Sequence, residues 1–187
     1  NFSNILPLSN TKLIKLNSNV QLDFSSIAKG YAVDKLSAFL KKEGILCFFI
    51  DVGGEIKVGE PKYSKDNWRL GIQDPRQASR ITAIKLVDVK NTAMATSGNY
   101  RQYYEYNGKK VSHIIDARTG YPIEFNNKQT ILSATAFSAS AAIADGLATA
   151  MMVLSVDDSK KLLSYYPGSS AVLFFEDTNG NLSELSL

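Results

Sequence analysis

The pattern of hydrophobic and polar positions follows two periods, which predicts a mixture of helices and strands. Apolar residues recur at helical spacing over residues 26–43, and Gly44 directly after them is a typical helix end. Residues 138–154 are apolar on almost every side, as in a helix buried within a domain, and Ser138 is a plausible N-cap. A third, amphipathic segment covers residues 157–166 and ends before a Pro-Gly pair. We therefore predict helices over these three ranges.

Short apolar or alternating segments between the helices predict β-strands. The Asn107-Gly108 pair separates two such segments, which favours a hairpin with a type I′ turn. Because hairpins are mixed with helices, we predict the α+β class, with mixed or antiparallel sheets packed with a few helices in a single domain over residues 1–187. The ranges expected to form strands are 13–16, 20–22, 45–52, 56–58, 68–72, 81–89, 101–106, 110–115, 130–137 and 171–175.

The buried helix carries a carboxylate among apolar neighbours. Asp145 and Thr149 are four residues apart and therefore share one face of this helix. A buried carboxylate is costly unless it is paired or binds a metal, and a hydroxyl one turn away adds a second hard oxygen ligand suited to Mg²⁺. The spacing leaves two interpretations open: a magnesium site, or a Thr bonded to its own helix beside an Asp bonded to a loop amide.

Composition and charge indicate a globular protein and argue against a nucleic-acid partner. The 187 residues are 44% hydrophobic and 21% charged, which is typical of a globular protein, and the net charge is +3. The lysines are scattered rather than gathered in a stripe, so we expect no nucleic-acid partner. Cys47 is the only cysteine, which excludes an internal disulfide, and we expect it to be a buried small hydrophobic residue. We also expect no membrane-spanning segment, because no stretch is sufficiently long and apolar.

Three further stretches carry candidate chemistry. Asp23, Ser25 and Ser26 lie at the start of the first helix, where free backbone amides favour an anion such as phosphate, although a plain N-cap would use the same residues. The paired glycines of residues 53–54 permit a tight turn or the close approach of a ligand. His113, the only histidine, is on the second arm of the predicted hairpin.

Five motifs in order along the chain carry a resemblance to a known family. They are DFSSIAKGYA at 23–32, DVGGEI at 51–56, ATSGNY at 95–100, SHIIDARTGYP at 112–122 and ADGLATA at 144–150. Together they resemble the FAD:protein FMN transferases of the ApbE family, formerly described as thiamine-biosynthesis lipoproteins. Ala117 replaces the usual proline of the fourth motif, which is a minor departure. The family carries roughly another half-domain before the first motif, so we expect that an upstream portion is missing here.

The resemblance implies an ApbE-like, T-fold-like core and a Mg²⁺-dependent reaction. Such enzymes cut FAD, attach its FMN half through a phosphoester to a Thr or Ser hydroxyl of an acceptor flavoprotein, and release AMP. Acceptors include subunits of membrane redox pumps. The implied location is the bacterial cell envelope, in the periplasm or on the outer face of the cytoplasmic membrane, with a possible lipid anchor in the full-length protein. Two alternatives stay open: an FAD pyrophosphatase that gives FMN and AMP, and an inactive flavin-binding module.

The resemblance also assigns roles to individual residues and favours the magnesium interpretation of the Asp145–Thr149 pair. His113 would be the base that activates the acceptor hydroxyl, a task suited to histidine because its unperturbed pKa is about 6.5. A cation would neutralise the charge of the pyrophosphate and of the leaving AMP. The metal ligands implied are the main-chain carbonyl of Ser26 with Asp145 and Thr149, and the residues implied to bind FAD are Asp23, Lys29, Thr96, Ser97, Gly98 and Ile114.

Overall fold

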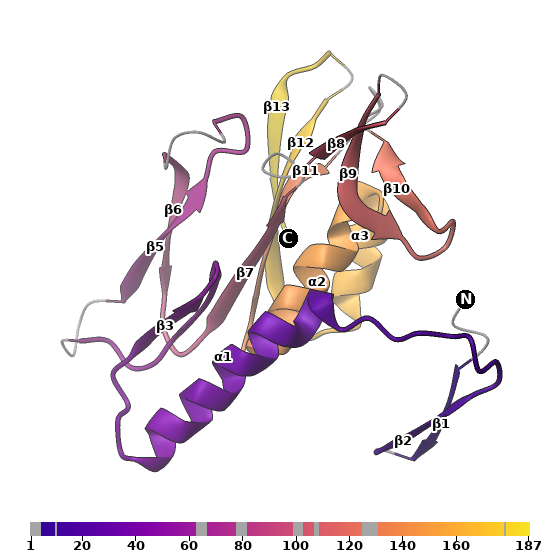
Figure 1. The fold of residues 1–187 in the computed structure, drawn as a ribbon. Helices are drawn as coiled ribbons and strands as arrows, with labels where there is room; N and C mark the ends of the chain where they lie inside the picture. Colours follow the sequence, from indigo (N-terminus) through magenta and orange to yellow (C-terminus); the bar gives the residue numbers. More distant parts are fainter. Residues whose placement is uncertain are drawn as a thin grey trace.

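A six-stranded antiparallel sheet lies at the centre of the computed structural model, with the strand order β13-β12-β11-β7-β4-β3 (Figure 1). The structure describes residues 5–9, 11–62, 67–77, 82–98, 103–106, 109–124, 131–177 and 179–187. The strands of the central sheet are β3 (Phe49–Val52), β4 (Glu55–Val58), β7 (Ala93–Gly98), β11 (Ile131–Ser138), β12 (Ser170–Glu176) and β13 (Leu182–Ser186).

Helices cover one face of the central sheet and a hairpin covers the other (Figure 1). Ala134 and Leu173 of the sheet pack with α2, whereas Met94 and Phe174 pack with Leu70 of the hairpin. This alternation follows from the strand geometry, because successive side chains point to opposite faces. The elements of the two outer layers are α1 (Ser25–Lys42), α2 (Ala141–Met152), α3 (Val156–Ser164), β5 (Trp68–Gln73) and β6 (Ala83–Val89).

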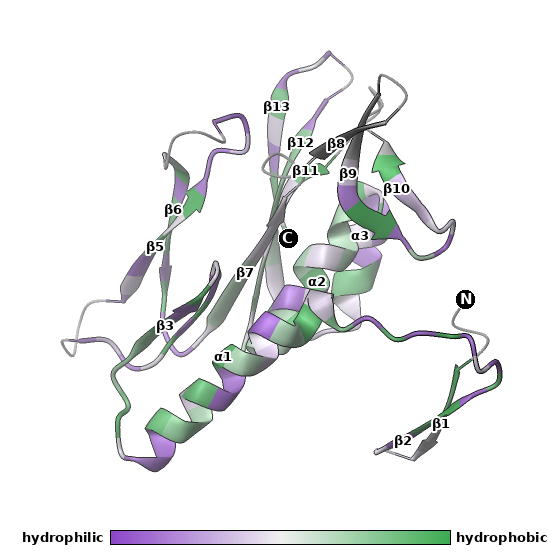
Figure 2. Ribbon diagram, in the orientation of Figure 1, coloured by the Kyte–Doolittle hydropathy of each residue, from purple (hydrophilic) through white to green (hydrophobic). Residues whose placement is uncertain are grey.

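Two small sheets complete the fold. One has the order β10-β9-β8 and the other is a hairpin of β1 and β2, which lies apart from the central sheet in Figure 1. Figure 2 shows hydrophobic segments along the visible side of α1, and Phe24 at its N-cap and Tyr31 and Phe39 within it are exposed. The strands of the small sheets are β1 (Ile5–Ser9), β2 (Lys12–Lys15), β8 (Tyr103–Tyr106), β9 (Lys109–Asp116) and β10 (Tyr121–Glu124).

The predicted class and the three predicted helices are confirmed. The first helix begins and ends within one residue of the predicted bounds, and Gly44 adopts a φ of 78° just beyond it. The N-cap of the second helix was predicted wrongly. Ser138 is the last residue of β11, and Ser140 caps α2 instead by accepting a hydrogen bond of 3.3 Å from the Ile143 amide. None of the helices in the described ranges is long and apolar enough to cross a membrane.

Two strand predictions are wrong in an instructive way. Residues 20–22 form no strand, because β2 pairs with β1 and the chain then runs irregularly to α1. The strand predicted over residues 45–52 begins only at Phe49, and Cys47 is exposed rather than buried. The apolar residues before Phe49 form the connection from α1, in which only Phe48 packs into the core. The hairpin of β8 and β9 is confirmed, although its turn at 107–108 lies outside the described residues.

Candidate functional site

The site is built where α1 crosses α2, and glycine makes the crossing close. A Cβ at Gly30 would lie 2.3 Å from the Ala141 carbonyl oxygen, so only glycine allows the two backbones to approach in this way. A Cβ at Gly146 would lie 3.2 Å from Cγ2 of Ile27. These contacts place the first turns of α1 beside the first half of α2, which carries Asp145.

The Asp145 carboxylate is buried and reaches back to α1. Its residue is only 3% exposed, and its Oδ2 accepts a hydrogen bond of 3.0 Å from the Gly30 amide. In a regular helix the Gly30 amide would donate to the carbonyl of Ser26, four residues earlier. The Gly30 amide thus has two candidate acceptors, the Asp145 carboxylate and the Ser26 carbonyl, and its bond to Asp145 ties that side chain to the first turns of α1. Oδ1 of Asp145 accepts no hydrogen bond from any residue that the structure describes.

Two buried carboxylates share one lysine at this crossing. Burial raises the pKa of Asp145, against the smaller opposing effects of the Gly30 amide and the Lys29 charge. Burial also raises the pKa of Glu55; Lys29 lowers it, and the nearby Asp145 charge raises it further. Lys29 is 2.7 Å from Oε2 of Glu55. Since one ammonium faces two carboxylates, the crossing favours a further cation when both carboxylates are ionised.

Thr149 is held by the central sheet. Its Oγ1 lies 3.1 Å from Oγ of Ser97, and either hydroxyl can donate the hydrogen bond. Thr96 points to the opposite face of β7, where its Oγ1 is 2.9 Å from Oγ1 of Thr135 on β11. The structure thus brings the Ser97 side chain to Thr149 but turns the Thr96 side chain away. Gly98, another predicted FAD contact, is half-buried at the end of β7.

The predicted residues of the first motif lie at the start of α1. Asp23 is exposed, and the pKa of its carboxyl is lowered chiefly by the hydrogen bond of 2.7 Å that its Oδ1 accepts from the Ser25 amide. Ser26 is half-buried in the first turn, and Lys29 follows one turn later with half of its side chain exposed. Asp23 and Lys29 are therefore accessible to a ligand, whereas Asp145 lies deeper.

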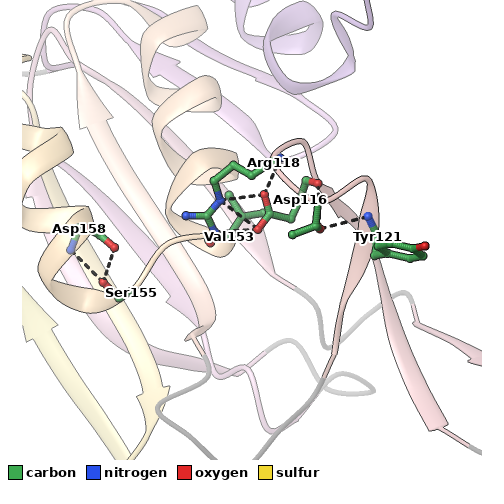
Figure 3. A network of polar contacts seen from close by, with 7 residues as sticks. Asp116, Arg118, Tyr121, Val153, Ser155 and Asp158 are labelled. Carbon is green, nitrogen blue, oxygen red and sulfur yellow. Dashed lines mark hydrogen bonds and ion pairs between the residues drawn. The ribbon is translucent and has the colours of Figure 1, made fainter. Parts of the chain in front are cut away.

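His113 lies on β9, beside the helix that carries Asp145. Ile114 is 9% exposed and belongs to the same hydrophobic cluster as Ala148 and Met151 of α2. His113 is exposed, as expected for the neighbouring position of a strand. The turn after β9 is tied to α2, because Arg118 donates a hydrogen bond of 2.7 Å to the Val153 carbonyl and also pairs with Asp116 (Figure 3). The strand of the candidate base is thus fixed to the helix of the candidate metal site.

Sequence reasoning missed Asp34, which fixes the start of α2. Its Oδ1 accepts hydrogen bonds from Lys57 at 2.6 Å and the Ala141 amide at 2.9 Å, and Oδ2 accepts from Ser140 Oγ at 2.7 Å and the Ala142 amide at 3.1 Å. Burial opposes ionisation of this carboxyl most strongly, yet these hydrogen bonds together lower its pKa.

Residue spacing along α1 gives one signal that could have found Asp34. Ser26, Gly30 and Asp34 recur every fourth residue and therefore share one face of the helix. Glu55 was missed as well, although it follows directly after the paired glycines of the second motif. Both missed carboxylates contact a lysine on another element, which the order of residues alone does not reveal.

The oxygen donors at the crossing fit a magnesium ion whose coordination shell is completed by oxygens of a bound substrate. They are one carboxylate, one hydroxyl and one main-chain carbonyl, from Asp145, Thr149 and Ser26. Among the described residues no group of three or more His, Cys, Asp or Glu side chains could hold a metal alone. Mg²⁺ characteristically binds through one or two carboxylates, keeps several waters and takes further oxygens from substrate phosphates. A small donor set of hard oxygens is therefore what such an ion requires.

Comparison with known proteins identifies the family. A family model described as the ApbE family matches residues 2–174. The chain belongs to the ApbE family. This confirms the resemblance carried by the five motifs and places the α1–α2 crossing within an ApbE-family core.

Individual relatives agree with this assignment. The FAD:protein FMN transferase of Salmonella typhimurium is 36% identical over 146 residues, which cover 78% of this chain and 40% of the relative. That of Vibrio cholerae is 37% identical over 149 residues, covering 80% and 43% respectively. The solved flavin transferase ApbE from Vibrio cholerae superimposes with a TM-score of 0.81 at 29% identity, covering all of this chain and 56% of that one. This ApbE-family chain thus matches about two fifths of its curated relatives' length.

Proposed function

We propose that this chain is the catalytic core of a Mg²⁺-dependent FAD:protein FMN transferase. The reaction would transfer the FMN moiety of FAD to a Thr or Ser hydroxyl of an acceptor flavoprotein and release AMP. The observation that carries the proposal is the buried Asp145 at the α1–α2 crossing, with Thr149 one turn away and a hydrogen bond to the Gly30 amide, one turn after Ser26. The relatives from Salmonella typhimurium and Vibrio cholerae are FAD:protein FMN transferases, which supports the same reaction.

Three residues at the crossing would provide the oxygen ligands of the metal. Asp145, Thr149 and the Ser26 carbonyl would hold Mg²⁺, and Ser97 fixes the Thr149 hydroxyl by its hydrogen bond. The bound ion would neutralise negative charge on the pyrophosphate and on the departing AMP.

At the accessible edge of the site, Lys29 and Asp23 would contact FAD. Gly98 and the main chain at Ile114 would line the same site. Thr96 could contribute only through its main chain, because its side chain points to the other face of β7.

His113 is the proposed base of the transfer. A Thr or Ser hydroxyl is a weak nucleophile at neutral pH, so removal of its proton assists its attack on phosphorus. As the new bond forms between the acceptor oxygen and the FMN phosphorus, the phosphoanhydride bond to AMP breaks. The hydroxyl proton passes to the imidazole of His113, and AMP leaves with the bridging oxygen and its electron pair. The exposed position of His113 on β9 leaves it accessible to an acceptor protein.

The proposed partners are FAD and an acceptor flavoprotein such as a subunit of a membrane redox pump. The proposed location is the bacterial cell envelope, in the periplasm or at the outer face of the cytoplasmic membrane, and a lipid anchor in the full-length protein would hold it there. These proposals rest on the family and on the reaction, since an enzyme that modifies a membrane pump has to reach it.

The test is to incubate the chain with FAD, Mg²⁺ and an acceptor that carries one modifiable Thr, and to measure the acceptor mass. The expected result is a covalent FMN adduct, lost in the Asp145→Ala variant and in an acceptor whose Thr is replaced by Ala. Release of FMN and AMP without an adduct would identify an FAD pyrophosphatase instead. Binding of FAD with neither product would identify an inactive flavin-binding module.

A further inference from the structure

Two ion pairs of opposite polarity join β4 to α1. Lys57 Nζ of the strand is 2.6 Å from Asp34 Oδ1 of the helix, and Glu55 Oε2 of the strand is 2.7 Å from Lys29 Nζ of the helix. Glu55 and Lys57 are two residues apart and therefore point to the same face of the sheet. The first pair has a clear structural task, because Asp34 also satisfies amides at the start of α2. The second pair differs because its two side chains are very unequally buried.

Glu55 is buried far more deeply than the lysine that it contacts. Its side chain is 5% exposed, whereas the side chain of Lys29 is 50% exposed. Among the described residues, Lys29 is the one side chain that makes an ion pair with Oε2 of Glu55, which otherwise meets no hydrogen bond of regular geometry. A buried carboxylate with a single, half-exposed partner recovers little of its desolvation cost. The pair is thus a poor means of stabilising the fold.

The position of Lys29 indicates what the pair does. Lys29 precedes Gly30, whose amide donates to Asp145, and the charge of Lys29 acts on the Asp145 and Glu55 carboxylates together. Its stem lies over the turn between β3 and β4, where a Cβ at Gly53 would be 3.6 Å from Cδ of Lys29. The ammonium is therefore held by Glu55 near enough to act on the Asp145 charge, while half of the Lys29 side chain is open to solvent.

We propose that Glu55 is a positioning residue that fixes the ammonium of Lys29 beside Asp145, aimed at a phosphate group bound there. The ligand class is a phosphate-bearing dinucleotide, and in this respect the inference rests on the proposed function. Without Glu55, the long lysine side chain would be free to adopt other rotamers in solvent, and the entropy of ordering it would oppose binding. Glu55 thus orders the Lys29 side chain before the ligand binds, so that binding does not carry this entropic cost.

The first test needs no ligand. Lysine acylation by a soluble reagent is followed by mass spectrometry in the wild type, in Glu55→Gln and in the matched control Glu60→Gln. The Glu60 side chain is 46% exposed and lies 3.8 Å from Lys90, so its substitution removes a looser ion pair near the same strand, and the amide oxygen of glutamine can still accept the hydrogen bond from Asn91. We expect Lys29 to react several-fold faster in Glu55→Gln and at the wild-type rate in Glu60→Gln. An unchanged Lys29 rate in a folded Glu55→Gln protein would overturn the proposal.

The second test is a double-mutant cycle on the dissociation constant of FAD in the presence of Mg²⁺. Glu55→Gln and Lys29→Met should each weaken binding by about tenfold or more, the size of a charge-assisted hydrogen bond. The double variant should bind no more weakly than Lys29→Met, because Glu55 acts through Lys29. Additive losses, or a Glu55→Gln protein with unchanged affinity, would overturn the proposal. If the wild-type chain bound no FAD, the proposed function would fail, and the acylation result would still decide the role of Glu55.

Discussion

Replacing Gly30 by alanine tests the helix crossing that builds the site. The added Cβ would lie 2.3 Å from the Ala141 carbonyl oxygen, 2.6 Å from the Ala141 carbonyl carbon and 2.8 Å from Cα of Ala142. All three are backbone atoms, so no side-chain rotation can relieve the clash. Ordinary contact begins at 3.4 Å, so α1 and α2 would have to separate by about 1 Å. The same shift would pull the Gly30 amide away from Asp145.

The cost can be estimated from three effects. Overpacking of a tight contact typically costs about 1–3 kcal/mol, and loss of a hydrogen bond to a charged group costs about 1.5–3 kcal/mol. The higher helix propensity of alanine offsets this loss by about 1 kcal/mol relative to glycine. We expect Gly30→Ala to lower the free energy of unfolding by about 1.5–5 kcal/mol. A displacement of about 1 Å between binding groups can also cost about 100-fold in transfer rate.

Gly146→Ala is the matched control in the partner helix. Its Cβ would approach only the end of the Ile27 side chain, at 3.2 Å, so a shift of that methyl group relieves the contact. Helix propensity then offsets the remaining crowding, and we expect the free energy of unfolding to change by less than about 1 kcal/mol.

The assay is urea unfolding followed by the fluorescence of Trp68, the only tryptophan, together with Mn²⁺ titration as a probe of cation binding. Gly30→Ala should lose stability and cation affinity together, while Gly146→Ala should retain both. If the two variants proved equally stable and bound Mn²⁺ equally well, the close crossing would not be what assembles the site.

Three further substitutions separate structural from chemical roles. Asp34→Asn should lower the free energy of unfolding at pH 7 by about 1.5–3 kcal/mol. Because the folded-state pKa of Asp34 is lowered, this contribution is present above its ordinary value of 3.8 and is lost as the pH falls through the folded value. The difference measured by urea unfolding should therefore shrink as the pH is lowered below 3.8, and a constant difference would contradict the assignment. Asp145→Ala should abolish Mn²⁺ binding but change the metal-free unfolding free energy by less than about 1 kcal/mol, since the buried charge is removed along with its hydrogen bond. A large loss of thermal stability in the metal-free variant would instead show that Asp145 is structural. His113→Asn should slow FMN transfer by about 10²–10⁴-fold with FAD and Mg²⁺ binding unchanged, and an unaltered rate would rule out the base.

The parts of the site that lie within one element were predictable from the sequence. Helical spacing placed Asp145 and Thr149 on one face, and the apolar surroundings indicated that this face is buried. The start of α1 followed from its polar entry and its periodicity. The N-cap of α2 did not, because Ser138 and Ser140 are both good caps and the pairing of Ser138 with Ala93 extends β11 to that residue.

The contacts between elements were not predictable from these patterns. Asp34 reaches amides more than 100 residues away, and only the α1–α2 crossing brings them together. Thr96 belongs to a motif of the family, yet the register of β7 with β11 decides that its side chain faces Thr135. Cys47 was expected in the core because its neighbours are apolar, but the chain there is still turning from α1 into β3.

The most direct test of the account is a crystal of this chain grown with FAD and Mn²⁺ and measured for the anomalous signal of the metal. The account predicts a peak bounded by the Asp145 carboxylate, the Thr149 hydroxyl and the Ser26 carbonyl, with phosphate oxygens completing the shell. Refinement with Mg²⁺ in its place should give oxygen distances of about 2.0–2.1 Å. Bound FAD with no peak at Asp145, or a peak held by other residues, would contradict the central claim that the α1–α2 crossing builds the metal site.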